Sequence, residues 1–271
     1  MTARRAAVIR GLNIEGHHWR YDMAGHGDDT LLLLTGGAGE GNPIADTLGP
    51  LADEIVILAP VYPPLATIEQ LLSGIVWILD REGISKAHMF GASLGGAIAQ
   101  CLVRRHPDRV KSLMLANTAA PVPWAGPLVR TVRGVFRALP GGWLVETMKK
   151  KLTKTMASSK AERPAVRRKI DETMAGFAKV DLLAMCDYVA DYHSHYRFTN
   201  ADLSGWPGRV LIIESEDDPM VPRRHRERLK RLYPNAKVHT FAAGGHAPGL
   251  HDPAAMLDLM QGFLSDRIAR S

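Results

Sequence analysis

Cysteine is scarce in this sequence, and long apolar runs are missing from it. Only 2 of the 271 residues are cysteine, which excludes a disulfide framework and a cysteine-rich zinc site. The longest uncharged apolar runs, at 31–34 and 71–79, are too short to cross a bilayer. The first ten residues hold only a short apolar stretch at 6–9, which is unlike a secretory signal. Together these absences predict a reduced, water-soluble protein of the cytoplasm.

Acidic side chains are few in one segment of the chain. The formal net charge is +6, from 34 Lys and Arg against 28 Asp and Glu. Residues 121–180 hold 13 basic and 4 acidic side chains, so this segment carries +9 and the remainder carries −3. A basic surface suits nucleic acid, an anionic membrane or an acidic substrate. The uneven distribution restricts that property to one segment.

Short apolar runs alternate with helical periodicity over most of the chain. We expect strands at 31–34, 55–59, 88–90, 113–116, 210–213 and 238–241, and helices at 67–82, 94–106, 223–232 and 254–264. Such alternation is typical of βαβ units and a mostly parallel sheet, and the chain up to Tyr21 suits an antiparallel hairpin. From 121 to 200 the sequence is helix-like, basic and rich in Met. We therefore predict an α/β core, formed by 1–120 and 201–271, that is interrupted by a helical cap at 121–200.

A candidate nucleophile stands between a predicted strand and a predicted helix. Residues 91–95 form a G-x-S-x-G motif with Ser93 at its centre. A sharp strand-to-helix turn exposes the serine hydroxyl, and the flanking glycines avoid clashes within the strained turn. The alternative is a tight turn that contains an incidental serine. The strand before the motif and the helix after it favour the nucleophile.

The motif and its surroundings resemble those of the α/β-hydrolase superfamily, and the resemblance covers nearly the whole chain. It implies a mostly parallel central sheet flanked by helices, with the helical cap inserted after the sixth strand. Residues 90–96, followed by Ala99 and Gln100, are also similar to the corresponding turn of maspardin-like members. That narrower likeness is local, and it keeps open a non-catalytic binding or scaffold role.

A serine nucleophile requires a base, and the base requires an acid that orients it. In this superfamily they follow in the order Ser, acid, His. The family pattern places the acid three residues before a Val-Pro pair, which selects Asp218, with Asp217 as the alternative. Glu214 and Glu216 are then expected to be solvated loop charges. The base selected by the family's Gly-His loop is His246, 28 residues after Asp218.

An acyl-transfer site also needs N–H groups that bind the developing oxyanion. The elbow supplies one, the backbone N–H of Leu94. The resemblance places the second at Gly37, in the glycine-rich loop 35–41, where Thr35 replaces the family's histidine. This loop fits neither the dinucleotide pattern nor a P-loop, and the chain has no H-E-x-x-H motif. We therefore expect no cofactor and no metal.

The predicted cap contains an amphipathic segment. Five apolar residues lie on one helical face, namely Leu128, Val132, Val135, Phe136 and Leu139. Arg130, Arg133 and Arg137 lie on the opposite face. This pattern predicts a lid whose apolar side faces the active site and whose charges face water. The alternative is a weak contact with anionic lipid. Nucleic-acid binding is not expected, because the segment lacks a recognisable fold and stacking aromatics.

These residues predict a serine hydrolase that cleaves a carboxylic ester of a small acyl substrate through an acyl-enzyme. The nucleophile, acid and base are Ser93, Asp218 and His246, and no cofactor takes part. Serine at the nucleophile position argues against the dehalogenase and epoxide-hydrolase branches, which use Asp. Hydrolysis of a carbon–carbon bond or of a thioester remains an alternative within the same fold, because fold does not fix function.

Overall fold

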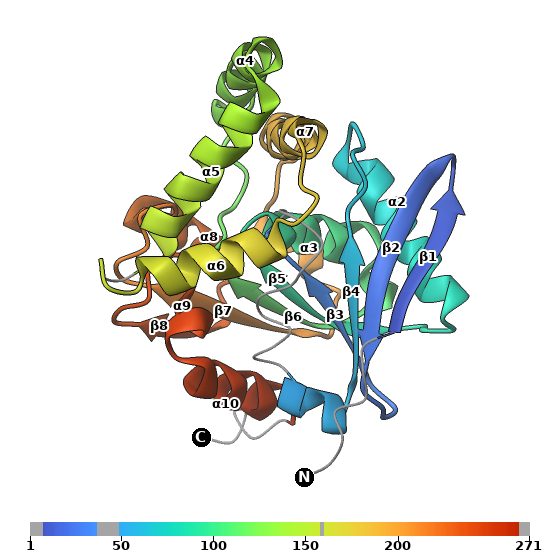
Figure 1. Cartoon of the computed structure of the whole chain (residues 1–271). Coiled ribbons are helices and arrows are strands. Elements are labelled where there is room, and N and C mark those ends of the chain that lie inside the picture. Colours follow the sequence, from blue (N-terminus) through green and yellow to red (C-terminus); the bar gives the residue numbers. More distant parts are fainter. Residues whose placement is uncertain (1–7, 37–48, 158–159, 266–271) are drawn as a thin grey trace.

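The computed structural model describes residues 8–36, 49–157 and 160–265. Eight strands form a single sheet in the order β1-β2-β4-β3-β5-β6-β7-β8 (Figure 1). The strands are β1 (Val8–Ile14), β2 (His17–Ala24), β3 (Thr30–Leu34), β4 (Val56–Val61), β5 (Ala87–Ala92), β6 (Val110–Ala116), β7 (Arg209–Ser215) and β8 (Lys237–Phe241). Strands β1, β2 and β4 pair antiparallel, and the pairs from β4 to β8 are parallel. This confirms the mostly parallel sheet that the sequence predicted.

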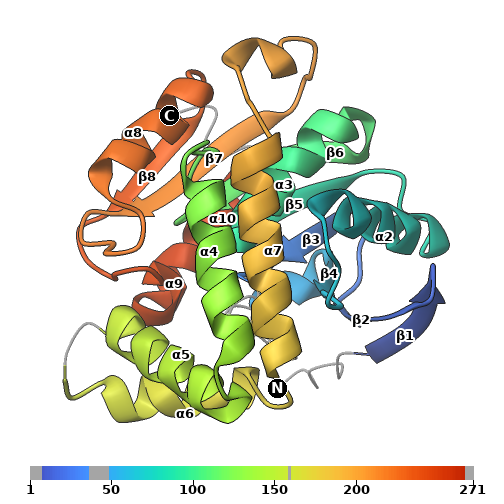
Figure 2. The ribbon, with the colours of Figure 1, turned by 90° about the horizontal axis from the view of Figure 1, so that it is seen from above.

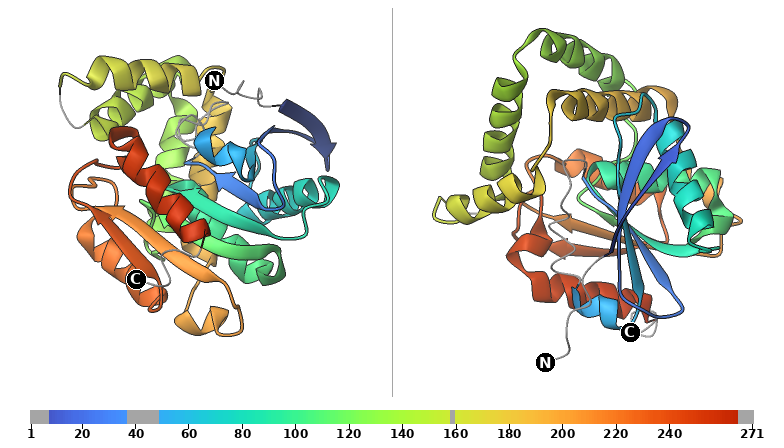
Figure 3. Two further views of the ribbon diagram at one scale, coloured as in Figure 1. Left: turned by 90° about the horizontal axis from the view of Figure 1, so that it is seen from below. Right: turned by 45° about the vertical axis from the view of Figure 1, so that its right-hand side comes forward.

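The central strands are apolar on both faces, which is expected of parallel strands covered by helices on both sides. All five residues of β3 are buried. Leu32 and Leu34 pack with α2 (Ile68–Arg81) and α3 (Leu94–Arg105) in one core cluster. Leu31 and Leu33 pack in a second cluster with α10 (Pro253–Leu264), which crosses the other face of the sheet (Figure 3, left). The core is therefore two apolar layers separated by the sheet.

Local capping signals fix where the core helices begin. Thr67 accepts a hydrogen bond from the backbone N–H of Gln70, whose side chain accepts one from the N–H of Thr67, so α2 starts with a capping box. Asp252 caps α10 in a similar way through the N–H of Ala255. A further helix, α8 (Arg223–Leu232), has the bounds expected from sequence. The predicted helices and strands are all present, with ends displaced by a few residues.

Among the described residues, four α-helices lie between β6 and β7, where the sequence predicted a cap. They are α4 (Ala125–Ala138), α5 (Gly141–Met156), α6 (Arg163–Thr173) and α7 (Lys179–His195). Seen from above, α4 and α7 lie side by side (Figure 2), and α4, α5 and α6 form an arm that extends beyond the sheet (Figure 3, right). The insertion after the sixth strand is as predicted. The boundaries at 121 and 200 remain a prediction.

The predicted division of α4 into an apolar and a charged face is only partly observed. Helix α4 contacts α7 through Gly126, where an added Cβ would lie 2.1 Å from the Ser194 hydroxyl. Arg133 turns toward α7 as well and pairs with Asp187. Leu128 remains 56% exposed. The expectation that the charges face water is therefore wrong for Arg133, because it lies two helical turns after Gly126, on the face of α4 that packs against α7.

Helix α7 is attached to the core by polar contacts as well as apolar ones. The Asp191 carboxylate accepts the N–H of Ile68 at 2.9 Å, at the start of α2. The Tyr188 hydroxyl accepts the N–H of Leu65 at 2.7 Å. The Tyr192 hydroxyl donates to the Ala119 carbonyl at 2.9 Å. Helix α7 is thus the firmly held part of the inserted segment.

Among the described residues, no helix is long and apolar enough to span a membrane.

His193, near the end of α7, joins the inserted segment to the chain that leads into it. Its Nδ1 accepts the backbone N–H of Val122 at 3.0 Å, so this nitrogen carries no proton. Burial, followed by repulsion from His225 and Arg228, lowers the pKa of His193 to about 4. An unfolded histidine, with its ordinary pKa of 6.5, takes up a proton below that pH, whereas the folded one does not. Acid therefore weakens folding through His193.

His193→Gln should reduce the acid sensitivity of stability. Glutamine can still accept the Val122 N–H, but it does not titrate. As pH falls from 6.5 to about 4, the free energy of unfolding of the wild type should fall faster than that of the variant. The difference is at most about 1.4 kcal/mol per pH unit. Urea unfolding at several pH values measures it. Parallel curves below pH 6.5 would show that His193 is not held neutral.

Candidate active site

The G-x-S-x-G segment forms a strained turn between β5 and α3. Ser93 has φ 51° and ψ −117°, a backbone conformation that costs a non-glycine residue free energy. An added Cβ at Gly91 would lie 2.6 Å from the Gly95 carbonyl oxygen, and one at Gly95 would lie 2.0 Å from the Leu34 oxygen. The two glycines are therefore required by close packing between β3, β5 and α3. The tight turn directs the Ser93 hydroxyl away from the strand.

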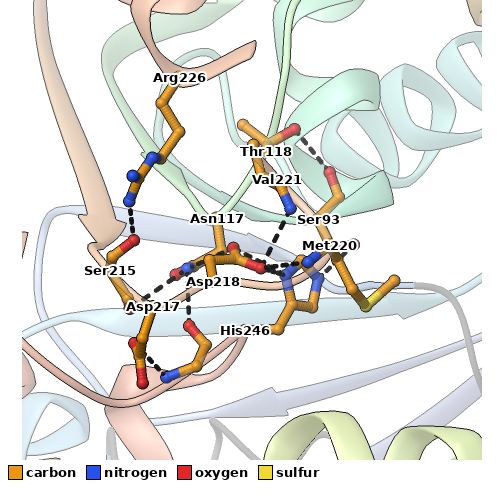
Figure 4. Close-up of polar contacts among 11 residues, drawn as sticks. Ser93, Asn117, Thr118, Ser215, Asp217, Asp218, Met220, Val221, Arg226 and His246 are labelled. Carbon is orange, nitrogen blue, oxygen red and sulfur yellow. Dashed lines mark hydrogen bonds and ion pairs between the residues drawn. The ribbon is translucent and has the colours of Figure 1, made fainter. Parts of the chain in front are cut away.

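The structure brings Ser93, His246 and Asp218 together from three different loops (Figure 4). The Ser93 Oγ lies 3.0 Å from Nε2 of His246. The Nδ1 of the same ring lies 3.0 Å and 3.1 Å from the two carboxylate oxygens of Asp218. Because a carboxylate only accepts, Nδ1 carries the proton and Nε2 is free to accept from the serine. This is the hydrogen-bonding order of nucleophile, base and orienting acid.

The carboxylate of Asp218 is fully buried, and backbone and side-chain donors surround it. Its Oδ1 accepts the N–H of Met220 at 2.8 Å and of Val221 at 3.1 Å, and its Oδ2 accepts the amide of Asn117 at 2.9 Å. Burial alone would raise the pKa of Asp218, but the hydrogen bond and charge of His246, with the other donors, lower it below the ordinary value. Asp218 is therefore ionised when the chain is folded at neutral pH.

Asp217, the alternative acid, contacts a different part of the same loop. Its carboxylate is exposed to solvent and accepts the N–H of Gly245 at 2.9 Å and of Gly244 at 3.4 Å. It therefore bonds the backbone of the turn that carries His246, whereas Asp218 bonds the imidazole. The turn has positive φ at both glycines, 130° at Gly244 and 57° at Gly245. Glycine is needed there because other residues would be strained.

The expectation that Glu214 is a solvated loop charge is wrong, whereas Glu216 is exposed as expected. Glu214 is buried, and its Oε1 accepts from Lys230 and from the Thr240 hydroxyl, each at 3.1 Å. The reason is that β7 continues through Ser215, so that Glu214 lies within the sheet beside β8 and under α8. A buried carboxylate needs such partners, because an unpaired buried charge is costly.

Of the two predicted oxyanion donors, Leu94 lies within the described residues and Gly37 does not. Leu94 is the first residue of α3, so its N–H belongs to the unpaired group at a helix N-terminus, which favours negative charge. Gly37 lies outside the described residues. Its neighbour Gly36 lies beside the nucleophile, since an added Cβ there would be 3.8 Å from Ser93 Oγ. The hydroxyl of the half-buried Tyr62 donates to the Thr35 carbonyl at 3.4 Å, at the start of this loop.

Three residues near the site were missed by sequence reasoning. Asn117 and Thr118 follow β6, and Tyr62 follows β4. Asn117 bonds the Asp218 carboxylate, and the Thr118 hydroxyl donates to the Ser93 carbonyl at 2.8 Å. Their positions just beyond the carboxyl ends of parallel strands were the available signal, because ligand sites gather there. Within the described ranges, no group of three or more His, Cys, Asp or Glu could hold a metal.

The sequence pattern of the alpha/beta hydrolase fold family matches residues 19–253, so the chain belongs to this family. It is 26% identical over 255 residues to the dihydrolipoyllysine-residue acetyltransferase component of the acetoin cleaving system of Cupriavidus necator, with 89% of this chain and only 65% of that protein covered. A protein of Caulobacter vibrioides named as carbamate hydrolase RutD is 27% identical over 217 residues, with 74% of each chain covered. The 2-hydroxymuconate semialdehyde hydrolase of Pseudomonas putida is 24% identical over 200 residues, with 70% of this chain and 66% of that protein covered.

Solved structures of hydrolases share the fold. A hydrolase from Pseudomonas aeruginosa PA01 has a TM-score of 0.80 at 19% identity, with 94% of this chain and 98% of that chain covered. The enol-lactonase from Burkholderia xenovorans LB400 has a TM-score of 0.77 at 17% identity, with 94% and 100% covered. At these identities the likeness is one of fold, and the chemistry has to be argued from the residues of this chain.

Two substitutions of Ser93 should separate the effect of backbone strain on stability from the effect of losing the hydroxyl. Ser93→Gly and Ser93→Ala both remove the hydroxyl, but only glycine accepts φ 51° without strain. We expect the glycine variant to be about 1 kcal/mol more stable than the alanine variant. Strain of this kind costs about 1–3 kcal/mol, and the added freedom of unfolded glycine offsets about 0.4–1 kcal/mol of it. Urea unfolding measures the difference, and equal stabilities would contradict a strained turn.

Proposed function

We propose that the protein is a serine hydrolase that cleaves a carboxylic ester of a small acyl substrate. The observation that carries the proposal is the unbroken hydrogen-bonded series from Ser93 Oγ through His246 to the buried Asp218, with links of 3.0 Å and 3.0–3.1 Å. Membership of a hydrolase family supports the reaction class. The serine stands on a strained turn beside a helix N-terminus, which is the arrangement that acyl transfer needs.

The geometry supports a two-step reaction. His246 Nε2 takes the proton of Ser93 as Oγ attacks the substrate carbonyl carbon, and the N–H groups of Leu94 and Gly37 bind the oxyanion. Collapse of this intermediate expels the alcohol, which receives the proton from His246, and leaves Ser93 acylated. Water then attacks the acyl-enzyme with His246 again as base, which releases the acid and restores Ser93. Asp218 holds the ring and stabilises its imidazolium form without itself taking the proton.

Each part of the site has a characteristic contribution to the rate. A positioned base supplies roughly 10²–10⁴-fold, and one oxyanion donor roughly 10²–10³-fold. Asp218 contributes through the tautomer of His246, because its carboxylate can accept only from a protonated Nδ1. Without that carboxylate the ring could place its proton on Nε2, where it would block abstraction from Ser93.

Carbon–carbon bond hydrolysis is the second candidate. One observation favours it: a relative with 70% of this chain covered is named 2-hydroxymuconate semialdehyde hydrolase. The same three residues could serve that reaction, a thioester or a carbamate, since the site fixes the nucleophile but not the leaving group. A non-catalytic role like that of maspardin-like proteins is disfavoured, because it gives no reason for the hydrogen bonds that join Ser93, His246 and Asp218.

A cytoplasmic location remains a prediction from the sequence.

Hydrolysis of p-nitrophenyl esters, from acetate to long acyl chains, tests the proposal. We expect turnover by the wild type and by the matched control Ser73→Ala, which changes an exposed serine on α2. Turnover by Ser93→Ala should fall by at least about 10³-fold, because base and acid cannot act without the nucleophile. A fluorophosphonate should label the wild type and the control but not Ser93→Ala. Wild-type activity that survives in Ser93→Ala would refute the assignment.

The alternatives have distinct outcomes in the same experiment. A folded wild type that is labelled by the fluorophosphonate but hydrolyses only a dienone-type substrate would favour the carbon–carbon hydrolase. A folded wild type that is neither labelled nor active would favour the non-catalytic role.

We also propose a weak contact between the inserted helices and anionic lipid. Leu128 and Val135 of α4 are both 56% exposed, and the same helix carries exposed Arg130 and Arg137. We expect cosedimentation with phosphatidylglycerol vesicles at about 0.02 M salt and release at about 0.5 M, because salt screens charge attraction. Phosphatidylcholine vesicles and the Arg130→Gln/Arg137→Gln variant are the controls, and both should bind less. No binding at low salt would reject the contact.

A further inference from the structure

Asn117 has an unusual backbone and a buried side chain. It follows β6, has φ 45°, and is only 5% exposed. Asparagine is one of the few residues other than glycine that tolerates this left-handed conformation. Its backbone N–H donates to the Ile213 carbonyl of β7 at 2.9 Å, which fixes the residue at the end of the sheet. The side chain is therefore held in one place by the strands on which it stands.

The side-chain amide of Asn117 faces both the acid and the loop of the base (Figure 4). Its Nδ2 lies 2.9 Å from Asp218 Oδ2 and 3.3 Å from the carbonyl oxygen of Gly245. The Ser215 hydroxyl lies 3.4 Å away. Because a carboxylate and a carbonyl can only accept, the NH₂ group and not the amide oxygen must face them. One NH₂ group thus joins Asp218 to the residue that precedes His246.

Removal of this donor would leave Asp218 incompletely held. Two backbone N–H groups and His246 Nδ1 contact Oδ1, whereas the described residues offer Oδ2 only His246 and Asn117. The side chain of Asp218 has no exposed surface, so bulk water cannot replace the lost hydrogen bond. The donor also favours the ionised carboxylate, because the Asn117 hydrogen bond is among the causes that lower the pKa of Asp218. The orientation of the carboxylate therefore depends on Asn117.

The residues on either side of Asn117 hold the nucleophile. The Ala116 carbonyl accepts the Ser93 N–H at 3.0 Å, and the Thr118 hydroxyl donates to the Ser93 carbonyl at 2.8 Å. Three consecutive residues at the end of β6 therefore contact the nucleophile on one side and the acid and base loop on the other. This short segment therefore sets the position of Ser93 relative to Asp218 and the loop that carries His246.

We propose that Asn117 is a positioning residue that fixes the Asp218 carboxylate and the His246 turn relative to Ser93. The inference rests on the proposed function, since it concerns how the same site is kept in register. It assigns to Asn117 an effect on the rate of serine acylation, beyond the stability that any buried hydrogen bond contributes. Asp217 provides the contrast, because its carboxylate holds the same turn through the N–H of Gly245 and offers no donor to the carboxylate of Asp218.

Asn117→Gly is the sharpest variant, because glycine accepts φ 45° and the substitution removes the amide without adding another group. We expect kcat for the p-nitrophenyl ester that the wild type hydrolyses best to fall by about 10–100-fold, because small misplacements of reacting groups cost this much. KM should change by less than about 2-fold, because Asn117 is buried and its side chain faces Asp218. The rate constant of fluorophosphonate labelling of Ser93 should fall in parallel. Asp217→Ala, which removes support from the His246 turn alone, should lose less than Asn117→Gly in both, and the exposed Ser73→Ala control should leave both unchanged.

A double-mutant cycle shows through which residue Asn117 acts. In the Asp218→Asn background, adding Asn117→Gly should lower kcat by less than it does in the wild type, because the carboxylate is already gone and only the contact with the Gly245 carbonyl remains to be lost. A purely structural role would instead lower the melting temperature in both backgrounds and leave kcat per labelled serine unchanged. That result would overturn the proposal. An equal loss of kcat in Asp217→Ala and Asn117→Gly would also overturn the proposal. Loss of support for the His246 turn would then explain both effects, without any role for the contact between Asn117 and Asp218.

A second variant keeps the test decisive if Asn117→Gly does not fold. Asn117→Asp preserves size and tolerates the left-handed backbone, but it replaces the donor by an acceptor beside Asp218. We expect the rate constant of fluorophosphonate labelling to fall by at least about 10-fold from the wild-type value, and wild-type labelling would overturn the proposal. Failure of the proposed function is a separate result, since the wild type itself would then be neither labelled nor active.

Discussion

One tightly packed turn, between β5 and α3, determines where everything else in the site must lie. Gly91 and Gly95 have no room for a Cβ because backbone oxygens lie within 2.6 Å and 2.0 Å of where it would stand. Ser93 is forced into a left-handed conformation, and hydrogen bonds from β6 hold it on both sides. The nucleophile is thereby attached to the central, largely buried strands of the sheet. Such placement on rigid elements gives the precision that catalysis requires.

The acid and the base, in contrast, are carried by loops, and loops need additional support. Asp218 follows β7, and His246 follows β8 on a turn with two left-handed glycines. Burial of the Asp218 carboxylate is unfavourable by itself, so donors must replace the water that it loses. The backbone beyond Asp218 supplies two of them, and His246 and Asn117 supply the others. The same hydrogen bonds that stabilise the charge also fix its direction.

The sequence was sufficient for features that are local in the chain. The alternation of strands and helices and the motif around Ser93 each depend on near neighbours, so their pattern is visible without a structure. It was not sufficient for contacts between distant segments. Asn117 and Asp218 are separated by 101 residues, and the position of the asparagine just beyond a strand does not reveal which residue its side chain contacts. Glu214 was misjudged for the same reason, because its burial depends on β8 and α8, which follow it in the chain.

The inserted helices contact the site on the side of the base. The Met156 carbonyl, at the end of α5, accepts from His251 at 2.8 Å, and the Thr155 carbonyl would lie 3.1 Å from a Cβ at Gly245. Gly245 is also the residue that Asn117 and Asp217 hold. A displacement of α5 by a bound substrate would therefore act first on the turn that carries His246, whereas Ser93 is held by the sheet. Contacts that fix this turn from the core limit how far such a displacement can reach the reacting atoms.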